Sequence, residues 1–120
     1  MIIDERIAQD GSIERIHLDV VDDRIVMTGP AGERSPVRLE VILTVIRRYG
    51  RPLDDSIPVP ETGIEIGPGI ELRSLKYRAL VDAAARDYAV LCVEDRPPLA
   101  VMSTTFTGAL RHLVKKDTQS

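Results

Sequence analysis

Short apolar segments separated by turn residues are the feature of this sequence that most limits its fold. Gly, Asp and Pro cluster between the apolar runs, and these residues adopt or fix the backbone angles that tight turns need. Such a chain favours antiparallel strands joined by hairpins, and it lacks the regular β-α-β alternation of a parallel doubly wound fold. The turn signals are Asp10-Gly11, Asp22-Asp23, Gly67-Pro68-Gly69 and Asp95-Arg96-Pro97-Pro98.

The first part of the chain predicts an antiparallel meander of three strands. Ile2–Ala8 forms one strand, and Ile16, Leu18 and Val20 then alternate with polar residues at the period of a half-buried strand. Arg24–Thr28 continues the pattern after the second turn. One face of this sheet is expected to lie on the core.

Ser35-Pro36 predicts the start of a helix, with Ser as the N-cap and Pro in the first helical position. Gly50 ends this helix, and Arg47 and Arg48 in its last turn complement the helix dipole. A broad arc of apolar side chains indicates that the helix packs on a sheet. The arc consists of Leu39, Val41, Ile42, Leu43, Val45, Ile46 and Tyr49.

A long connection rich in proline follows over Arg51–Gly63, and Ile64–Leu72 then reads as a hairpin centred on Pro68. Ser74 is expected to cap a second helix over residues 75–88. Charged residues at a spacing of four predict a solvated face on that helix. Its apolar stripe is Tyr77, Leu80, Val81, Ala84 and Tyr88, and its solvated face is Arg78, Asp82 and Arg86.

Two further strands, Ala89–Glu94 and Leu99–Ser103, lead into a final helix that Thr104 or Thr105 caps, while residues 117–120 are expected to fray. The predicted order is therefore β-β-β-α-β-β-α-β-β-α. We expect residues 1–120 to form one α+β domain with a mainly antiparallel sheet and helices on one face. The aromatic residues are all placed on apolar helix faces and are assigned to the core: Tyr49, Tyr77, Tyr88 and Phe106.

Composition narrows the class of protein. A chain with 43% hydrophobic and 29% charged residues is typical of a folded domain rather than a disordered one. Cys92 has no partner for a disulfide. The start of the chain lacks the pattern of a signal peptide, and the apolar run 41–46 is far short of a membrane helix. These observations predict a cytoplasmic protein that does not bind a membrane.

The charges fall in blocks. The formal net charge is −3, which argues against a surface built to grip nucleic acid. Residues 1–33 are strongly acidic, residues 34–52 are basic, and residues 53–72 carry five acidic and no basic side chains. Complementary blocks of this kind suit a homo-oligomer.

The search for chemistry yields weak candidates. His17 and Asp19 share one strand face but lack a third ligand, so neither a metal nor a cofactor is expected. Cys92 lies within an apolar strand, where a thiol behaves as a small hydrophobe. Asp54 and Asp55 are adjacent carboxylates on the long connection, where we favour a structural or partner-contact role over catalysis.

A basic patch on the last helix completes the set of candidate partner-contact residues. Its side chains are predicted to face outward, either to compensate the helix dipole or to contact an acidic partner. One such partner is the 53–72 segment of a second subunit. The patch consists of Arg111, His112, Lys115 and Lys116.

These features favour a non-catalytic accessory or regulatory module that acts by protein contact as a homodimer. The alternative is an enzyme or small-molecule-binding domain with a pocket near the 51–63 connection, where Asp54, Asp55 and a nearby Arg supply the polar groups. A third possibility is nucleic-acid binding through the final helix, which the lack of aromatic residues among its basic side chains disfavours.

Overall fold

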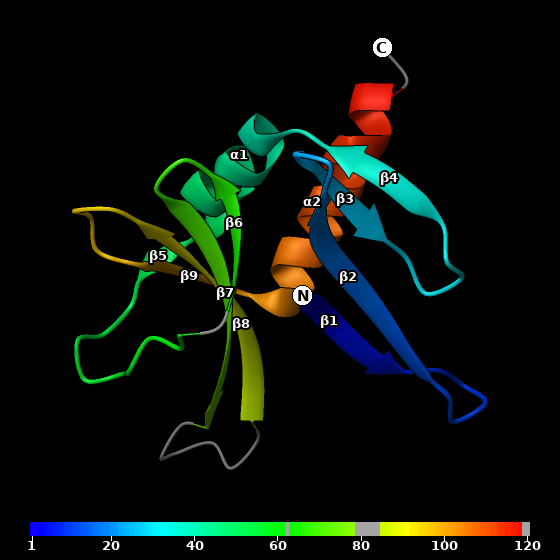
Figure 1. The fold of residues 1–120 in the computed structure, drawn as a ribbon. Coiled ribbons are helices and arrows are strands. Elements are labelled where there is room, and N and C mark those ends of the chain that lie inside the picture. Colours follow the sequence, from blue (N-terminus) through cyan, green and yellow to red (C-terminus); the bar gives the residue numbers. More distant parts are fainter. Residues whose placement is uncertain (62, 79–84, 119–120) are drawn as a thin grey trace.

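The structure is a computed structural model that describes residues 1–61, 63–78 and 85–118. Over these residues the chain forms an α+β fold with two antiparallel sheets and two helices, which confirms the predicted fold class. The elements are β1 (Ile2–Ile7), β2 (Ile13–Val21), β3 (Arg24–Thr28), β4 (Arg34–Val37), α1 (Leu39–Tyr49), β5 (Arg51–Pro52), β6 (Gly63–Gly67), β7 (Ile70–Arg78), β8 (Ala85–Val93), β9 (Leu99–Met102) and α2 (Ser103–Thr118). Figure 1 shows the two sheets side by side, with α2 between them and α1 next to the second sheet.

The first sheet has the strand order β1-β2-β3-β4, so the predicted meander is confirmed and gains a fourth strand within the described residues. Its turns have the left-handed backbone that the sequence indicated. Gly11 has φ of 85°, and Asp22 and Asp23 have φ of 52° and 63°. Two successive residues with positive φ match the twist of the flanking strands, which explains the tight β2-β3 hairpin.

The predicted start of the first helix is wrong. Ser35 and Pro36 lie in β4, where Pro36 is paired with Val26, and α1 begins at Leu39 after an extended Arg38. Proline cannot donate to a strand ladder, but β4 is an edge strand of its sheet and tolerates the missing donor. The end of the helix is confirmed, since Gly50 is its C-cap and its amide donates to the Ile46 carbonyl.

The predicted helix over 75–88 is also wrong where the structure describes it. Residues up to Arg78 belong to β7 and residues from Ala85 belong to β8, while Leu80, Val81, Asp82 and Ala84 lie outside the described residues. The two strands pair along their length, with Leu75 opposite Tyr88. Cross-strand pairing, with Leu75 beside the aromatic Tyr88, outweighs the helical spacing that the sequence also allows.

The second sheet has the order β5-β9-β8-β7-β6. The hairpin about Pro68 is confirmed, and Gly69 takes φ of 70° in its turn. The connection predicted over 51–63 is shorter than expected, because Arg51 and Pro52 form β5 and pair with β9. The element order in the described chain is therefore β-β-β-β-α-β-β-β-β-β-α.

One hydrophobic core joins both sheets and both helices. Helix α2 packs on α1 and contacts strands β1, β4, β8 and β9 (Figure 1). Because α2 bridges the two sheets, the helices cover the inner faces of two sheets rather than one face of a single sheet. The most deeply buried side chains of this core include Leu18, Ile42, Ile46, Leu72, Phe106 and Leu110.

The second sheet is also covered on its other face. Leu75 and Val90 are buried, but their register places them opposite the core residues Leu72 and Leu91 on the same strands. The segment over residues 53–61 crosses this face, and the Arg73 Nη1 donates a hydrogen bond to the Pro60 carbonyl at 3.1 Å. Burial on both faces explains why β8 reads as a continuous apolar run.

Candidate functional site

A pocket of 510 Å³ lies between the 53–61 segment and the outer face of the second sheet, and we call it the loop pocket. Its volume falls in the range of about 300–1,000 Å³ that is typical of small-molecule sites. Apolar side chains form most of its lining. The lining residues are Tyr49, Arg51, Pro52, Leu53, Asp54, Ile57, Leu75, Arg86, Tyr88, Ala100, Val101 and Met102.

The strand register builds the floor of the loop pocket. Leu75 on β7 pairs with Tyr88 on β8, and Tyr88 pairs with Met102 on β9, so the three side chains form one row across the sheet. Ala100 lies two residues before Met102 and faces the same side. Hydrogen-bonded strands hold these positions, so the floor is fixed before any ligand arrives.

Two arginines stand at opposite ends of this floor. Arg51 is paired with Ala100 through β5, and Arg86 lies two residues before Tyr88 on β8. The Arg86 Nη1 lies 3.8 Å from the Met102 Sδ, and the Arg51 Nη1 donates to the Gly50 carbonyl at 3.2 Å. Both side chains are exposed and line the pocket.

Among the residues that the structure describes, Asp54 is the carboxylate that lines the loop pocket. Its Oδ1 accepts hydrogen bonds from the Ser56 backbone amide at 2.9 Å and from the Ser56 Oγ at 2.8 Å. These two bonds hold the pKa of Asp54 below its ordinary value of 3.8, so the group is ionised at neutral pH. Asp54 therefore shapes the turn that carries the segment over the pocket.

The structure places a pocket near this connection, and its lining differs in part from the residues that the sequence suggested. The structure brings Asp54, Arg51 and Arg86 together, while Asp55 is exposed and is not among the lining residues. Arg86 was missed because it was assigned to a solvated helix face. Its alternation with Tyr88 and Val90 is the strand signal that identifies it.

The assignment of all aromatic residues to the core is wrong for two of them. Phe106 is fully buried, but Tyr49 is 41% exposed and Tyr88 is half-buried, and both line the loop pocket. The backbone of Tyr77 lies in β7 rather than in a helix. Aromatic side chains thus remain for contact with a ligand.

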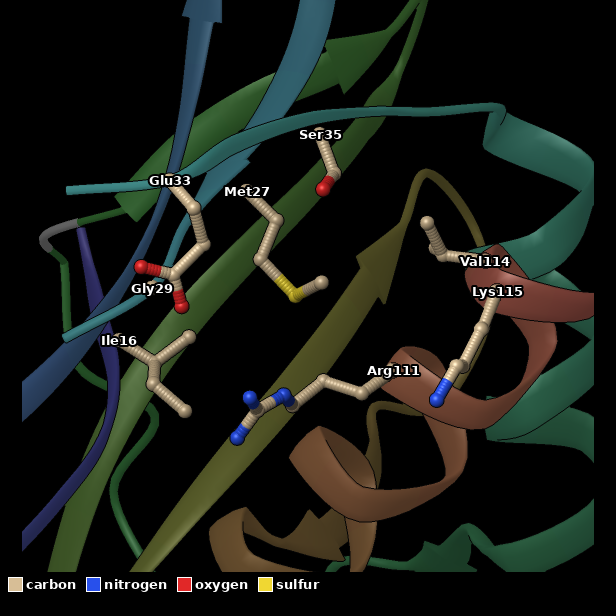
Figure 2. Close-up of a pocket in the computed structure, with 8 residues that line it drawn as sticks. All are labelled: Ile16, Met27, Gly29, Glu33, Ser35, Arg111, Val114 and Lys115. Carbon is tan, nitrogen blue, oxygen red and sulfur yellow. The ribbon is translucent and has the colours of Figure 1, made fainter. Parts of the chain in front are cut away.

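A second cleft, of 220 Å³, lies between α2 and the first sheet, and we call it the basic cleft. Figure 2 shows Arg111 and Lys115 extending from α2 into the cleft, across from Ile16 and Met27. Glu33 lies on the strand side, where its carboxylate accepts the Ala31 amide at 3.0 Å. An acidic group therefore shares the cleft with the two basic ones.

The predicted basic patch divides between two surfaces. Arg111 and Lys115 line the basic cleft, whereas His112 and Lys116 do not, although all four side chains are exposed. Residues at a spacing of four lie on one face of a helix, which explains why Arg111 and Lys115 turn toward the sheet together.

The remaining candidates, the His17 and Asp19 pair and Cys92, lie in surroundings that do not favour metal binding or catalysis. The Asp19 Oδ1 lies 2.6 Å from the amino group of Met1, and no group of metal-binding side chains forms among the residues that the structure describes. Cys92 is half-buried, and burial raises the pKa of its thiol above the ordinary value of 9.0 despite the neighbouring Arg73. A raised pKa keeps the thiol protonated and weakly nucleophilic at neutral pH.

Comparisons with protein-family models, with curated proteins and with solved structures find no match to this chain. Within the described residues, neither helix has the length and apolar character needed to cross a membrane. We therefore infer the chemistry of the loop pocket and the basic cleft from the side chains that line them.

Proposed function

We propose that the protein is a small-molecule-binding domain that holds its ligand in the loop pocket. The observation that carries this proposal is a pocket of 510 Å³ whose apolar floor is built on three paired strands and whose mouth carries two arginines. Apolar walls with a few placed polar groups are the usual composition of such sites.

The cover of the pocket supports the same proposal. The 53–61 segment is joined to the sheet by the Leu53 amide, which donates to the Pro98 carbonyl at 3.1 Å, and by the bond between Arg73 and Pro60. Leu53 and Ile57 from this segment face the pocket across from Leu75. A rigid floor with a separate covering segment is a common way to enclose a ligand.

The ionisable groups favour binding over catalysis. Within the described part of the chain, the charged lining side chains are Arg51, Asp54 and Arg86, and Asp54 already accepts two hydrogen bonds from Ser56. Guanidinium groups stay protonated and act as donors, so this set positions an anion rather than moving a proton.

Filling the pocket tests the proposal. In a thermal-shift screen of small metabolites, we expect a ligand at about 100 times its Kd to raise the Tm of the wild type by about 10 °C. Ala100→Phe places a ring on the pocket floor and should abolish that shift. Ala100→Leu should reduce it, which gives a second variant should the larger ring disturb the strand.

The matched control is Ala31→Phe, which adds the same ring in an exposed turn away from the pocket and should leave the shift intact. Equal stabilisation of the Ala100→Phe and Ala31→Phe proteins would place the ligand elsewhere. A broad panel without effect on the wild type would reject the proposal.

The protein-contact hypothesis remains a second candidate, and one observation favours it. The described part of α2 exposes all four residues of the basic patch, while Asp54 and Asp55 are exposed on the 53–61 segment. Complementary charges on two exposed surfaces steer association between two copies of the chain. We propose this contact as the basis of a homodimer.

Reversing the basic charges tests the dimer. Lys115→Glu with Lys116→Glu should weaken self-association about tenfold, as measured by native mass spectrometry over a dilution series. Adding Asp55→Lys and Glu61→Lys should restore it, because the charges are then exchanged between the two surfaces. A mass that is the same for wild type and the reversed variant at every concentration would rule out this use of the patch.

A further inference from the structure

We infer that the ligand of the loop pocket is a small amphipathic carboxylate, with an aromatic or aliphatic body and an anionic head. This inference rests on the proposed function and names the class of molecule that the same pocket selects. It follows from the arrangement of the apolar floor and of the charged groups around it.

The floor fits an apolar body. Leu75, Tyr88 and Met102 lie in one cross-strand row, and Ile57 faces them from the covering segment. Leu75 is only 8% exposed, so the protein already covers most of this side chain at the floor. The Tyr88 ring and the Met102 thioether adapt well to flat or flexible apolar groups.

The charges select the head group. Arg51 and Arg86 present guanidinium groups at the two ends of the floor, whereas Asp54 is the carboxylate among the lining residues that the structure describes. The Asp54 Oδ1 is already occupied by the Ser56 amide and hydroxyl. Guanidinium matches a carboxylate with two parallel hydrogen bonds, which a neutral amide or an amine cannot reproduce.

The position of the arginines also orients the ligand. Both side chains are exposed and the apolar row lies between them, so a head group at either arginine stays near solvent while the body lies on the sheet. A charged head at the mouth avoids the cost of full desolvation, and the apolar body supplies the burial.

Matched probes that differ in the head group test this inference. Phenylbutyrate and octanoate are each compared with the amide and the amine that carry the same body, and affinities are measured by NMR titration. For at least one body, we expect the wild type to bind the carboxylate about tenfold more tightly than the amide, with the amine weaker still. Arg51→Gln with Arg86→Gln should remove this preference and leave the amide affinity unchanged.

Two controls separate the inference from the proposed function. Arg47→Gln removes an exposed guanidinium of α1 that does not line the pocket, and it should leave the carboxylate preference intact. If the amides bind as well as the carboxylates and Ala100→Phe blocks both, the ligand class is wrong and the pocket function stands. If Ala100→Phe changes no probe affinity, the pocket function itself fails. A carboxylate preference that survives the double arginine variant also overturns the inference.

Discussion

Replacing Phe106 by alanine is expected to lower the free energy of unfolding by about 4 kcal/mol. Phe106 is fully buried in α2, and its helix contacts α1 and strands of both sheets. The substitution leaves a cavity at the point where these elements meet, so both the transfer energy of the ring and its packing contacts are lost. Urea denaturation followed by circular dichroism measures the change through the midpoint and slope of the transition.

The loss of unfolding free energy in Phe106→Ala measures how much the packing of α2 contributes to the stability of the fold. A domain of this length has a total stability of about 5–15 kcal/mol, so the loss amounts to a large part of it. Leu113→Ala on the same helix is the control, because Leu113 is half-buried and should cost about 1 kcal/mol. A Phe106→Ala protein within 1 kcal/mol of the wild type would contradict the core described for this fold.

Leu75→Ala is expected to destabilise the protein by about 2 kcal/mol even though Leu75 lies outside the main core. Leu72→Ala, three residues earlier on β7, faces the core and should cost about 3 kcal/mol. An outer sheet face that was open to water would make the Leu75 substitution nearly neutral. The two variants therefore measure burial on the two faces of one strand.

Limited proteolysis distinguishes the two variants further. Leu75→Ala removes a contact surface beneath the 53–61 segment, so cleavage within that segment should become faster than global unfolding allows. Leu72→Ala should raise cleavage only in proportion to its loss of global stability. Identical cleavage patterns in the two proteins would mean that the segment does not depend on the outer face of the sheet.

The residues in the turns made much of the fold predictable from the sequence. Asp22-Asp23 and the Gly67–Gly69 turn have backbone angles that few residue pairs adopt, so both hairpins follow from residue type alone. The apolar arc of α1 and Gly50 likewise predict the body and the end of that helix, since they depend on neighbours within the helix. These features are local and need no knowledge of the rest of the chain.

The errors arose where two local patterns compete and tertiary contacts decide. Over 75–78 and 85–88 the same residues fit a helical stripe and a strand, and pairing of Leu75 with Tyr88 selects the strand. Pro36 suits either the first turn of a helix or an edge strand, and pairing with Val26 selects the edge. The division into two sheets likewise depends on contacts between distant segments.

The candidate site could be predicted only in part from the sequence, for the same reason. The 51–63 connection and Asp54 were found from loop length and adjacent carboxylates, which are visible in the sequence. Arg86 and Tyr88 reach the pocket only when they alternate on a strand, so assigning them to a helix hid the floor. The pocket is a property of the sheet register rather than of any one segment.

The bridging position of α2 has a consequence for how this chain is made in the cell. Every strand that the structure describes, and α1, precedes residues 103–118 in the chain, so the inner faces of the two sheets still lack their bridging helix when these strands leave the ribosome. At a synthesis rate of about 5–20 residues per second, the helix that covers them follows about 1–3 seconds later. During that interval the nascent chain presents open sheets that invite aggregation, and chaperone binding protects it most at this stage.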